Sequence, residues 1–236
     1  ASDVYKRQEK EWAETYPLEK EALDYFIHNA GSPNGVIDGG IPVFAAGNEY
    51  AGNPAFPGAY SKCVCVASVA ADYTPACYTD YGTLVTLSAP GGDLEYYGKI
   101  GEEEDEYWAE TAEQKGAVLS TLIQNGKPAY GYMEGTSMAC PHVSGVAALG
   151  LAYAVKQHRH YRAADFVSLM KKAVKDLDGY YGNGATKIYY MNHTTVGASP
   201  EIVNLSKYIG KMGAGLIDAA PVSYTHLRAH ETVLDL

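Results

Sequence analysis

The chain has 236 residues, which is enough for one domain with a sizeable core, because folding buries about 70% of the chain surface at this size. It is 47% hydrophobic and 19% charged, with 25 glycines and 11 prolines, which is typical of mixed α/β globular proteins and unlike a disordered or fibrous chain. The net charge of −10 and the lack of a basic stripe argue against a nucleic-acid partner, since such proteins cluster Lys and Arg against phosphates.

The spacing of apolar residues predicts the elements in chain order. Residues 18–27 carry apolar side chains at helical spacing after Pro17, and 41–46 is a continuous apolar run typical of a strand buried on both faces. Further strands are predicted at 63–69, 84–87 and 117–122, and further helices at 137–158 and 166–177. Helices alternating with buried strands indicate an α/β domain with a largely parallel sheet. No membrane segment is predicted, because the longest apolar runs, 41–46 and 143–155, are shorter than the ~20 residues that span a bilayer.

Neither the acidic run nor the cysteines predict a metal site. Residues 94–117 contain an unbroken acidic run at 102–106, which we interpret as a solvated surface insertion. The cysteines are too few and too dispersed for a disulfide framework and lack Cys or His partners at short spacing. We interpret them as small buried apolar residues: Cys63, Cys65, Cys77 and Cys140.

The two ends of the chain are interpreted as not belonging to the protein. Residues 3–8 resemble the translation of a transposase adapter used in sequencing libraries, and residues 222–232 resemble the translation of its reverse complement. We therefore expect residues 1–8 and 222–236 to be assembly artefacts and residues 9–221 to be the body of the domain. On this hypothesis the gene continues beyond both ends.

Residues 135–145, with the sequence GTSMACPHVSG, place a serine where a loop becomes a helix. The start of a helix offers unpaired N–H groups and a partial positive charge, which stabilise an oxyanion. Pro141 suits a position near the first helical turn, since proline lacks the N–H. The segment resembles the serine motif of the subtilase family of subtilisin-like serine proteases along its whole length. The resemblance implies that Ser137 is the catalytic nucleophile.

Asn48 is the second candidate catalytic residue, at the end of the run 41–46. Acyl transfer develops negative charge on the scissile carbonyl oxygen, which a side-chain amide can stabilise alongside the N–H of Ser137. The segment resembles the oxyanion-hole segment of subtilases, although an Asn ending a strand in a turn has the same local pattern. By the same resemblance the substrate pocket is lined by Ala45, Ala46, Gly47 and Ala55, and the small Ala55 would leave it open and apolar.

Other matches extend the resemblance over roughly residues 15–220: 55–60 with 64–69, 78–82, 87–91 and 213–219, with Thr79 replacing the usual Ser. The resemblance implies a partial subtilisin-like three-layer fold whose N-terminal part is missing. It further implies a polypeptide substrate, an extracellular or cell-envelope location, no cofactor for catalysis, and structural calcium. No signal peptide is visible, and nothing in the sequence sets the oligomeric state.

The partners of the serine are missing from the sequence. A serine hydroxyl needs an adjacent base, itself oriented by a third group. The subtilase segments His-Gly-Thr-His and Asp-Ser/Thr-Gly do not occur, and Asp38 is not assigned. His142 lies five residues after Ser137 on the same helix, about 140° round it. The remaining histidines considered have no matching context: His28, His158, His160 and His193. We expect the parent protein to be a serine endopeptidase and the chain as given to be inactive.

Two alternatives remain. An α/β-hydrolase would place its Asp and His after the serine, and Asp178 and His193 could serve. Against it, Ala139 stands where that motif has glycine, no strand-like run leads into Gly135, and Asn48 is unexplained. The other alternative is a non-catalytic subtilase-like binding module.

Overall fold

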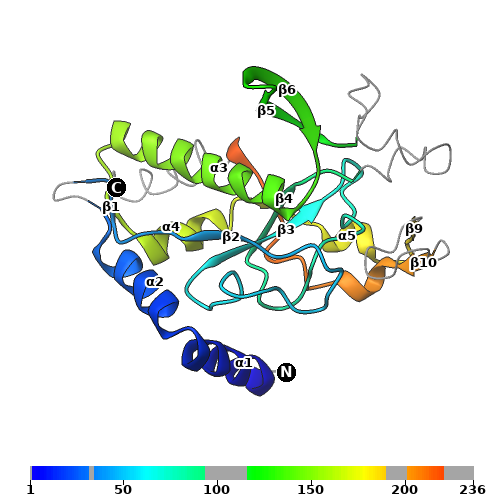
Figure 1. Cartoon of the computed structure of the whole chain (residues 1–236), viewed down its shortest axis with the longest axis horizontal. Coiled ribbons are helices and arrows are strands. Elements are labelled where there is room, and N and C mark those ends of the chain that lie inside the picture. The colour runs from blue at the N-terminus through cyan, green and yellow to red at the C-terminus, as the bar shows by residue number, and fades with distance from the viewer. Residues whose placement is uncertain (1, 32–34, 94–115, 190–200, 221–236) are drawn as a thin grey trace, which may run out of the picture.

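A five-stranded sheet lies at the centre of the computed structural model, which describes residues 2–31, 35–93, 116–189 and 201–220 (Figure 1). Its strands in spatial order are β2 (Val43–Ala45), β3 (Val64–Val69), β4 (Leu87–Pro90), β11 (Leu216–Ile217) and β8 (Val174–Lys175). The first four are parallel, and β8 is antiparallel to β11. The predicted α/β fold with a mostly parallel sheet is therefore confirmed.

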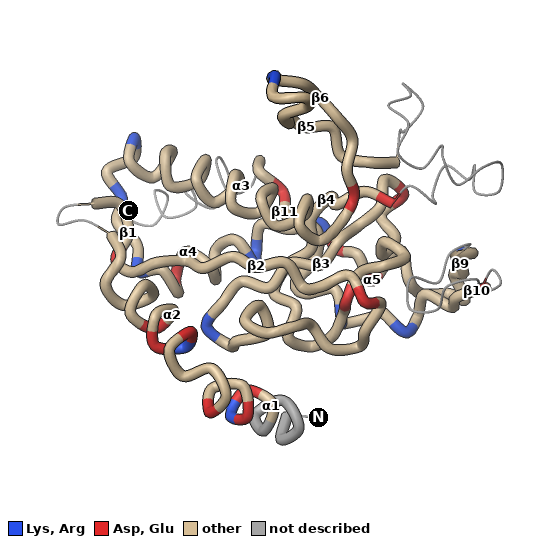
Figure 2. The backbone as a smooth tube through the Cα atoms, viewed as in Figure 1, with Lys and Arg blue, Asp and Glu red and all other residues tan. Residues whose placement is uncertain are grey.

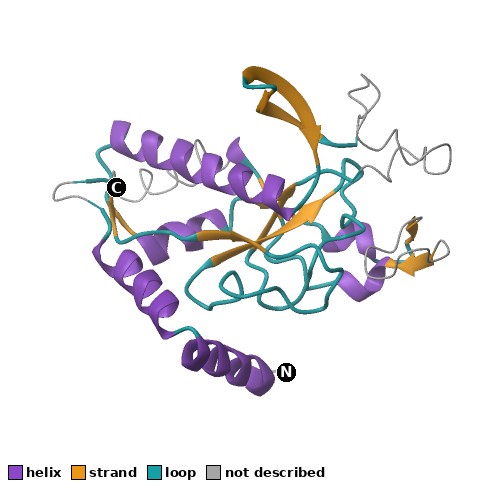
Figure 3. Ribbon diagram, viewed as in Figure 1, coloured by secondary structure: helices purple, strands orange, loops and turns teal. Residues whose placement is uncertain are grey.

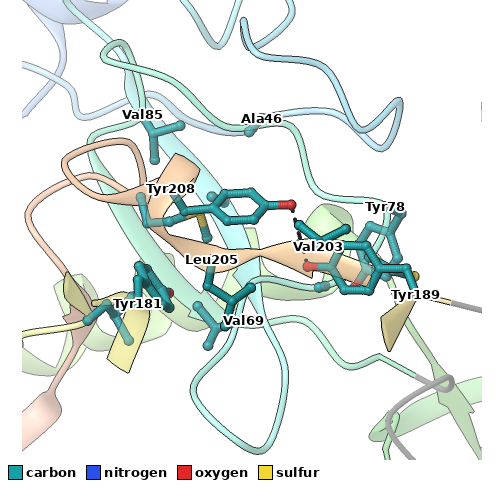
Figure 4. Packing of buried hydrophobic residues seen from close by; sticks show 14 of the residues in the cluster. Ala46, Val69, Tyr78, Val85, Tyr181, Tyr189, Val203, Leu205 and Tyr208 are labelled. Carbon is teal, nitrogen blue, oxygen red and sulfur yellow. Dashed lines mark hydrogen bonds between the residues drawn. The ribbon is translucent and has the colours of Figure 1, made fainter. Parts of the chain in front are cut away.

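Strand β3 separates the two main apolar clusters, because successive side chains of a strand point to opposite faces. All six residues of β3 are buried. Val64 and Val66 pack with residues of α3 (Thr136–Lys156) and α4 (Ala163–Met170). Cys65, Ala67 and Val69 instead join a cluster rich in tyrosine, shown in Figure 4, whose aromatic members include Tyr78, Tyr181, Tyr189 and Tyr208. The chain thus has helices on one face of the sheet and a tyrosine cluster on the other.

The remaining elements surround this centre (Figure 3). The helices are α1 (Ser2–Thr15), α2 (Pro17–Asn29), α5 (Asp178–Tyr181) and the 3-10 helix η3 (Leu205–Tyr208). The described residues form three further strand pairs: β1 (Ile37–Asp38) with β7 (Tyr161–Arg162), β5 (Val118–Gln124) with β6 (Lys127–Met133), and β9 (Thr186–Tyr189) with β10 (Glu201–Asn204). The β5–β6 hairpin projects from the molecule near the start of α3.

The structure corrects several predicted bounds. The strand predicted at 84–87 begins only at Leu87, because residues 82–85 form a turn closed by a 3.1 Å bond from Val85 N to Gly82 O. The helix predicted at 166–177 ends at Met170, and the chain then turns into β8. Strand β2 is half-buried rather than buried on both faces, because it is the edge strand of the sheet.

Helix α3 is longer than the apolar run 143–155, since it begins at Thr136. Within the described ranges it is the one helix that is long and apolar enough to cross a membrane by length and composition. The structure packs it against β2, β3 and β4. Its buried positions recur at the three- and four-residue spacing of a helix that covers a core: Ala139, Val143, Ala147, Gly150 and Ala154. Figure 2 shows that its charge is confined to its C-terminal end, at Lys156.

Cys63, Cys65 and Cys77 are buried as predicted, whereas Cys140 on α3 is only half-buried. Cys65 lies in the tyrosine cluster, whereas Cys63 precedes β3 and packs with Trp12 of α1 and Tyr60. The acidic run at 102–106 and the C-terminal segment 222–236 lie outside the described residues. Residues 2–8 belong to helix α1. The interpretation of both ends as artefacts stays a prediction.

Candidate active site

Ser137 is the second residue of α3, and Gly135 is the residue that caps its start. The backbone of Gly135 has φ 142°, in the region that favours glycine, so a side chain there would be strained. The Ser137 side chain is exposed, and no described residue hydrogen-bonds its hydroxyl. Its N–H is among the first of the helix, which have no partner within the helix. The predicted helix start near Ser137 is confirmed.

Two expectations about this segment were wrong. A strand does lead into Gly135, because β6 ends at Met133, and its Pro128 and Gly131 had hidden it from pattern analysis. This strand pairs only with β5 in an antiparallel hairpin, so it is not the central-sheet strand of an α/β-hydrolase elbow. Pro141 is the sixth helical residue rather than a first-turn residue, so it removes one bond from inside the helix.

Asn48 is held against the start of α3 by Thr136, which is fully buried. Its Oδ1 accepts hydrogen bonds from Thr136 N at 2.9 Å and from Thr136 Oγ1 at 2.8 Å. A backbone N–H can only donate, so the carbonyl oxygen of the amide must face Thr136 and the Nδ2 donor must face away. The Thr136 hydroxyl is oriented in turn, since it accepts from Gly47 N at 3.3 Å.

Nδ2 of Asn48 makes no hydrogen bond with the described residues and lies 3.7 Å from where a Cβ on Gly135 would stand. The amide donor and the start of α3 are therefore adjacent. This is the arrangement that can stabilise negative charge developing on an acyl oxygen beside Ser137.

The turn before Ser137 is hydrogen-bonded to the residue that follows β4. Gly135 N donates to Gly91 O at 2.9 Å and to the Tyr78 hydroxyl at 2.8 Å. Gly91 allows this approach, because a Cβ on it would lie 2.1 Å from Ser68 Oγ and 2.6 Å from Gly135 O. Burial raises the pKa of Tyr78 well above its usual range, so its hydroxyl stays protonated. Asn48 after β2 and Gly91 after β4 both lie at the carboxyl ends of parallel strands, where α/β sheets bind ligands.

The predicted pocket residues lie around the end of β2. Ala55 is exposed and its N–H donates to the carbonyl of Ala46 at 2.8 Å. Ala45 and Gly47 are half-buried. The Ala46 side chain is fully buried in the tyrosine cluster, so only its backbone can face a ligand. Their role in substrate binding stays a prediction.

Sequence reasoning assigned no role to Thr136 or to two acidic residues beneath Asn48. Asp80 is 2% exposed, and its carboxylate accepts from the backbone of the segment that carries Asn48. Glu49 accepts from Asn48 N at 2.8 Å. Asp80 stands within the matched segment 78–82, but the residues whose N–H groups it accepts are 29 and 31 residues away in sequence, so no local pattern marks its role.

The described histidines lie away from the Ser137 hydroxyl. His142 is exposed, and its Nδ1 is 2.8 Å from Met138 O. His160 pairs with Asp38 at 2.8 Å, but this pair follows the far end of α3, a helix of 21 residues and about 30 Å in length. His28 bonds Asp24 O, His158 lies just beyond α3, and His193 is outside the described residues. Asp178 instead accepts from Gly210 N at 3.0 Å.

No acidic cluster among the described residues marks a calcium site, and structural calcium stays a prediction. Calcium takes six to eight oxygen ligands, several of them carboxylates. In the part of the chain that the structure describes, no three His, Cys, Asp or Glu side chains gather in a way that could hold a metal ion.

Known proteins resemble this chain over most of its length. The profile of the Subtilase family matches residues 4–184. Halolysin of Haloferax mediterranei is 36% identical over 112 residues, covering 48% of this chain and 17% of halolysin. Thermitase of Thermoactinomyces vulgaris is 30% identical over 151 residues, covering 64% of this chain and 43% of thermitase. Both are longer proteins, and this chain spans less than half of each. Other relatives carry the names of extracellular proteases, and one is named intracellular.

Among solved structures, the epidermin leader peptide processing serine protease of Staphylococcus aureus superposes with a TM-score of 0.51. The match is 21% identical and covers 78% of this chain and 39% of the other. At that identity the likeness shows the fold alone.

Proposed function

The chain belongs to the subtilase family, and from this premise we propose that the whole protein is a serine endopeptidase that cleaves peptide bonds through an acyl-enzyme on Ser137. The observation that carries the proposal is the Asn48 amide, which Thr136 orients beside the start of the helix bearing Ser137. An asparagine that only ends a strand is satisfied by neighbouring backbone groups, whereas Asn48 is oriented by a buried hydroxyl 88 residues away in sequence.

The chemistry follows from these positions. Ser137 Oγ attacks the scissile carbonyl carbon while a base takes the hydroxyl proton, and the carbonyl oxygen becomes an oxyanion. Asn48 Nδ2 and the N–H of Ser137 donate hydrogen bonds to that oxyanion. Collapse of the intermediate breaks the C–N bond, and the base returns the proton to the leaving amine. Water then hydrolyses the ester by the same steps and restores the serine.

The base and the carboxylate that orients it belong, on this proposal, to residues of the whole protein that this sequence does not include. The segment formed by Ala45, Ala46, Gly47 and Ala55 would accept the substrate residue before the scissile bond. By family resemblance the substrate is a polypeptide and the location is extracellular or the cell envelope. By the same resemblance the whole protein would hold structural calcium. Its ligands would then not come from a cluster of three or more acidic side chains among the described residues.

The test is covalent labelling of the whole protein with a fluorophosphonate probe, followed by identification of the labelled peptide. Ser137→Ala should abolish labelling. Ser144→Ala is the matched control, because Ser144 is another exposed serine of α3 and should leave labelling intact. Undiminished labelling of Ser137→Ala would show that another residue is the nucleophile. A well-folded whole protein that is neither labelled nor hydrolyses peptides would favour the binding module.

A further inference from the structure

A buried aspartate organises the segment that carries Asn48, residues 46–51, which we call the oxyanion loop. Asp80 Oδ1 accepts hydrogen bonds from Glu49 N at 3.0 Å and from Ala51 N at 2.7 Å. The backbone N–H of Asp80 donates to Gly47 O at 3.0 Å. Three backbone groups of the loop are therefore tied to one residue whose side chain is almost entirely buried.

A second carboxyl group meets Asp80 under Gly47. The position that a Cβ on Gly47 would take is 2.2 Å from Asp80 Oδ2 and 2.7 Å from Glu49 Oε2. The two carboxyl groups therefore lie side by side beneath Gly47. Since Oδ1 of Asp80 already accepts two N–H groups and Glu49 Oε2 accepts Asn48 N, a bond between the carboxyl groups requires a proton on one of them.

The surroundings place that proton on Asp80. Burial, and then the neighbouring Glu49, raise the pKa of Asp80 to about 7, against the opposing effect of its bond from Ala51 N. The titratable groups near it are Cys65 of β3, whose pKa is raised by burial and by Asp80, and its chain neighbour Tyr81, whose pKa is raised by burial, by Glu201 and by Asp80. The cations Lys207 and Lys211 lie over the ring of Tyr81.

We propose that Asp80 and Glu49 share one proton and act as positioning residues for Asn48, so that loss of this proton displaces the oxyanion loop and lowers turnover. The inference rests on the proposed function in one respect, namely that Asn48 is the oxyanion donor. Neither carboxyl group contacts the reacting atoms; both act through the loop backbone.

The direction of the pH effect follows from the charges. Below neutral pH the pair carries one negative charge and one shared proton. Above neutral pH both carboxyl groups are ionised, and the two neighbouring negative charges under Gly47 repel one another. If only the protonated pair holds Asn48 in place, kcat falls about tenfold per pH unit above the midpoint. The free energy of unfolding should also fall as pH rises. The pKa of Asp80 is higher in the folded than in the unfolded state, so the folded protein loses stability as pH rises towards and through that folded-state pKa.

The test uses the whole protein and two variants in which the pair cannot carry two negative charges. In Asp80→Asn, the amide oxygen can accept from Glu49 N and Ala51 N, while the amide nitrogen donates to the Glu49 carboxylate at every pH. Glu49→Gln removes the negative charge of Glu49, and its amide nitrogen can donate a hydrogen bond to the Asp80 carboxylate. Asp72→Asn is the control. Asp72 is a half-buried aspartate that accepts hydrogen bonds from Thr74 in its own turn and lies 3.9 Å from Lys187 Nζ, and among the described residues no hydrogen bond or ion pair joins it to the oxyanion loop.

The wild type and Asp72→Asn should lose kcat above neutral pH with little change in KM. Asp80→Asn and Glu49→Gln should keep kcat at pH 6 within about twofold and lack this alkaline limb. A ¹³C carboxyl titration of Asp80 in the Ser137→Ala protein should show a midpoint near neutrality, whether or not the protein is a protease. An active enzyme with the same alkaline limb in all variants, or an Asp80 carboxyl titrating near 4, overturns the proposal and leaves the proposed function standing.

Discussion

The buried hydroxyl of Thr136 donates a 2.8 Å hydrogen bond to Oδ1 of Asn48, and the backbone N–H of the same Thr136 donates a second bond of 2.9 Å to the same oxygen. One residue thus sets both which way the amide points and how far it lies from the helix start. Because Ser137 is the next residue along the chain, the proposed nucleophile and the proposed oxyanion donor are positioned by a single turn of backbone.

Replacement of Thr136 by Val should lower kcat of the whole protein by roughly tenfold with little change in KM, equivalent to about 1.4 kcal/mol of transition-state stabilisation. The side chain keeps its volume but loses the bond to Asn48 and leaves Gly47 N without its acceptor. Thr136→Ser retains the hydroxyl and should restore kcat. Steady-state kinetics well below the melting temperature separate this effect from stability, and a destabilised variant with normal kcat would assign Thr136 a purely structural role.

Asn48→Asp should abolish most turnover while leaving the fold intact. The carboxylate keeps an oxygen for Thr136 but replaces the Nδ2 donor by a negatively charged acceptor. We expect kcat to fall by at least 10²-fold, a magnitude that comes from the oxyanion asparagine of subtilisin itself. Asn48→Ala is a weaker test, because it also leaves both Thr136 donors without their acceptor. Unchanged kcat in Asn48→Asp, at an unchanged melting temperature, would favour the strand-ending role of this residue.

Asp24 should contribute to stability at neutral pH and not in acid. It binds Lys20, Lys62 and the Tyr60 hydroxyl, and the two lysines hold its pKa well below the usual range. A lowered folded-state pKa gives stability that is present above the unfolded value of about 3.9 and is lost as pH falls below it. Asp24→Asn should cost about 1 kcal/mol in urea unfolding at pH 7, and the difference should shrink near pH 3.

The control for Asp24 is Asp165→Asn, which removes an exposed pair with Arg162 three residues away and should cost less. Equal losses for both variants, or a loss for Asp24→Asn that persists in acid, would show that the Asp24 network does not contribute through its charge.

The 236-residue chain by itself should show essentially no protease activity. In subtilisin, an oxyanion hole without the triad retains only about 10³–10⁴-fold catalysis over water, against the millions contributed by the intact triad. The chain should also aggregate, because β2 is a sheet edge and apolar side chains are left uncovered at Leu18, Leu149 and Val155, which are 80%, 51% and 57% exposed.

The measurement is to express residues 9–220 and to follow peptide hydrolysis and thermal unfolding. A soluble fragment that melts cooperatively, hydrolyses peptide at ordinary enzymatic rates and loses that activity in Ser137→Ala would contradict this prediction. It would also require a base within the sequence, with His28 or His193 as the first to test.

Much of the candidate site could be predicted from residues that are neighbours in sequence. The glycine, serine and helix of residues 135–145 are neighbours in sequence, so their geometry follows from how a helix begins. The end of β2 was likewise marked by its apolar run and the glycine that follows it. By contrast, β6 was missed because Pro128 and Gly131 interrupt its pattern, and the end of α4 was misplaced because Ala173 and Leu177 happen to continue a helical spacing into β8 and beyond.

The sequence by itself determined the family and the candidate residues Ser137 and Asn48, since these depend on short contiguous segments whose chemistry is local. Only the tertiary structure decided how Asn48 is oriented and which acidic residues lie beneath it. Thr136 is 88 residues from Asn48, and Asp80 is 31 residues from Glu49. Hydrogen bonds across such separations exist only once parallel strands bring their carboxyl ends together, and a proton shared between two carboxyl groups requires burial that no linear pattern records.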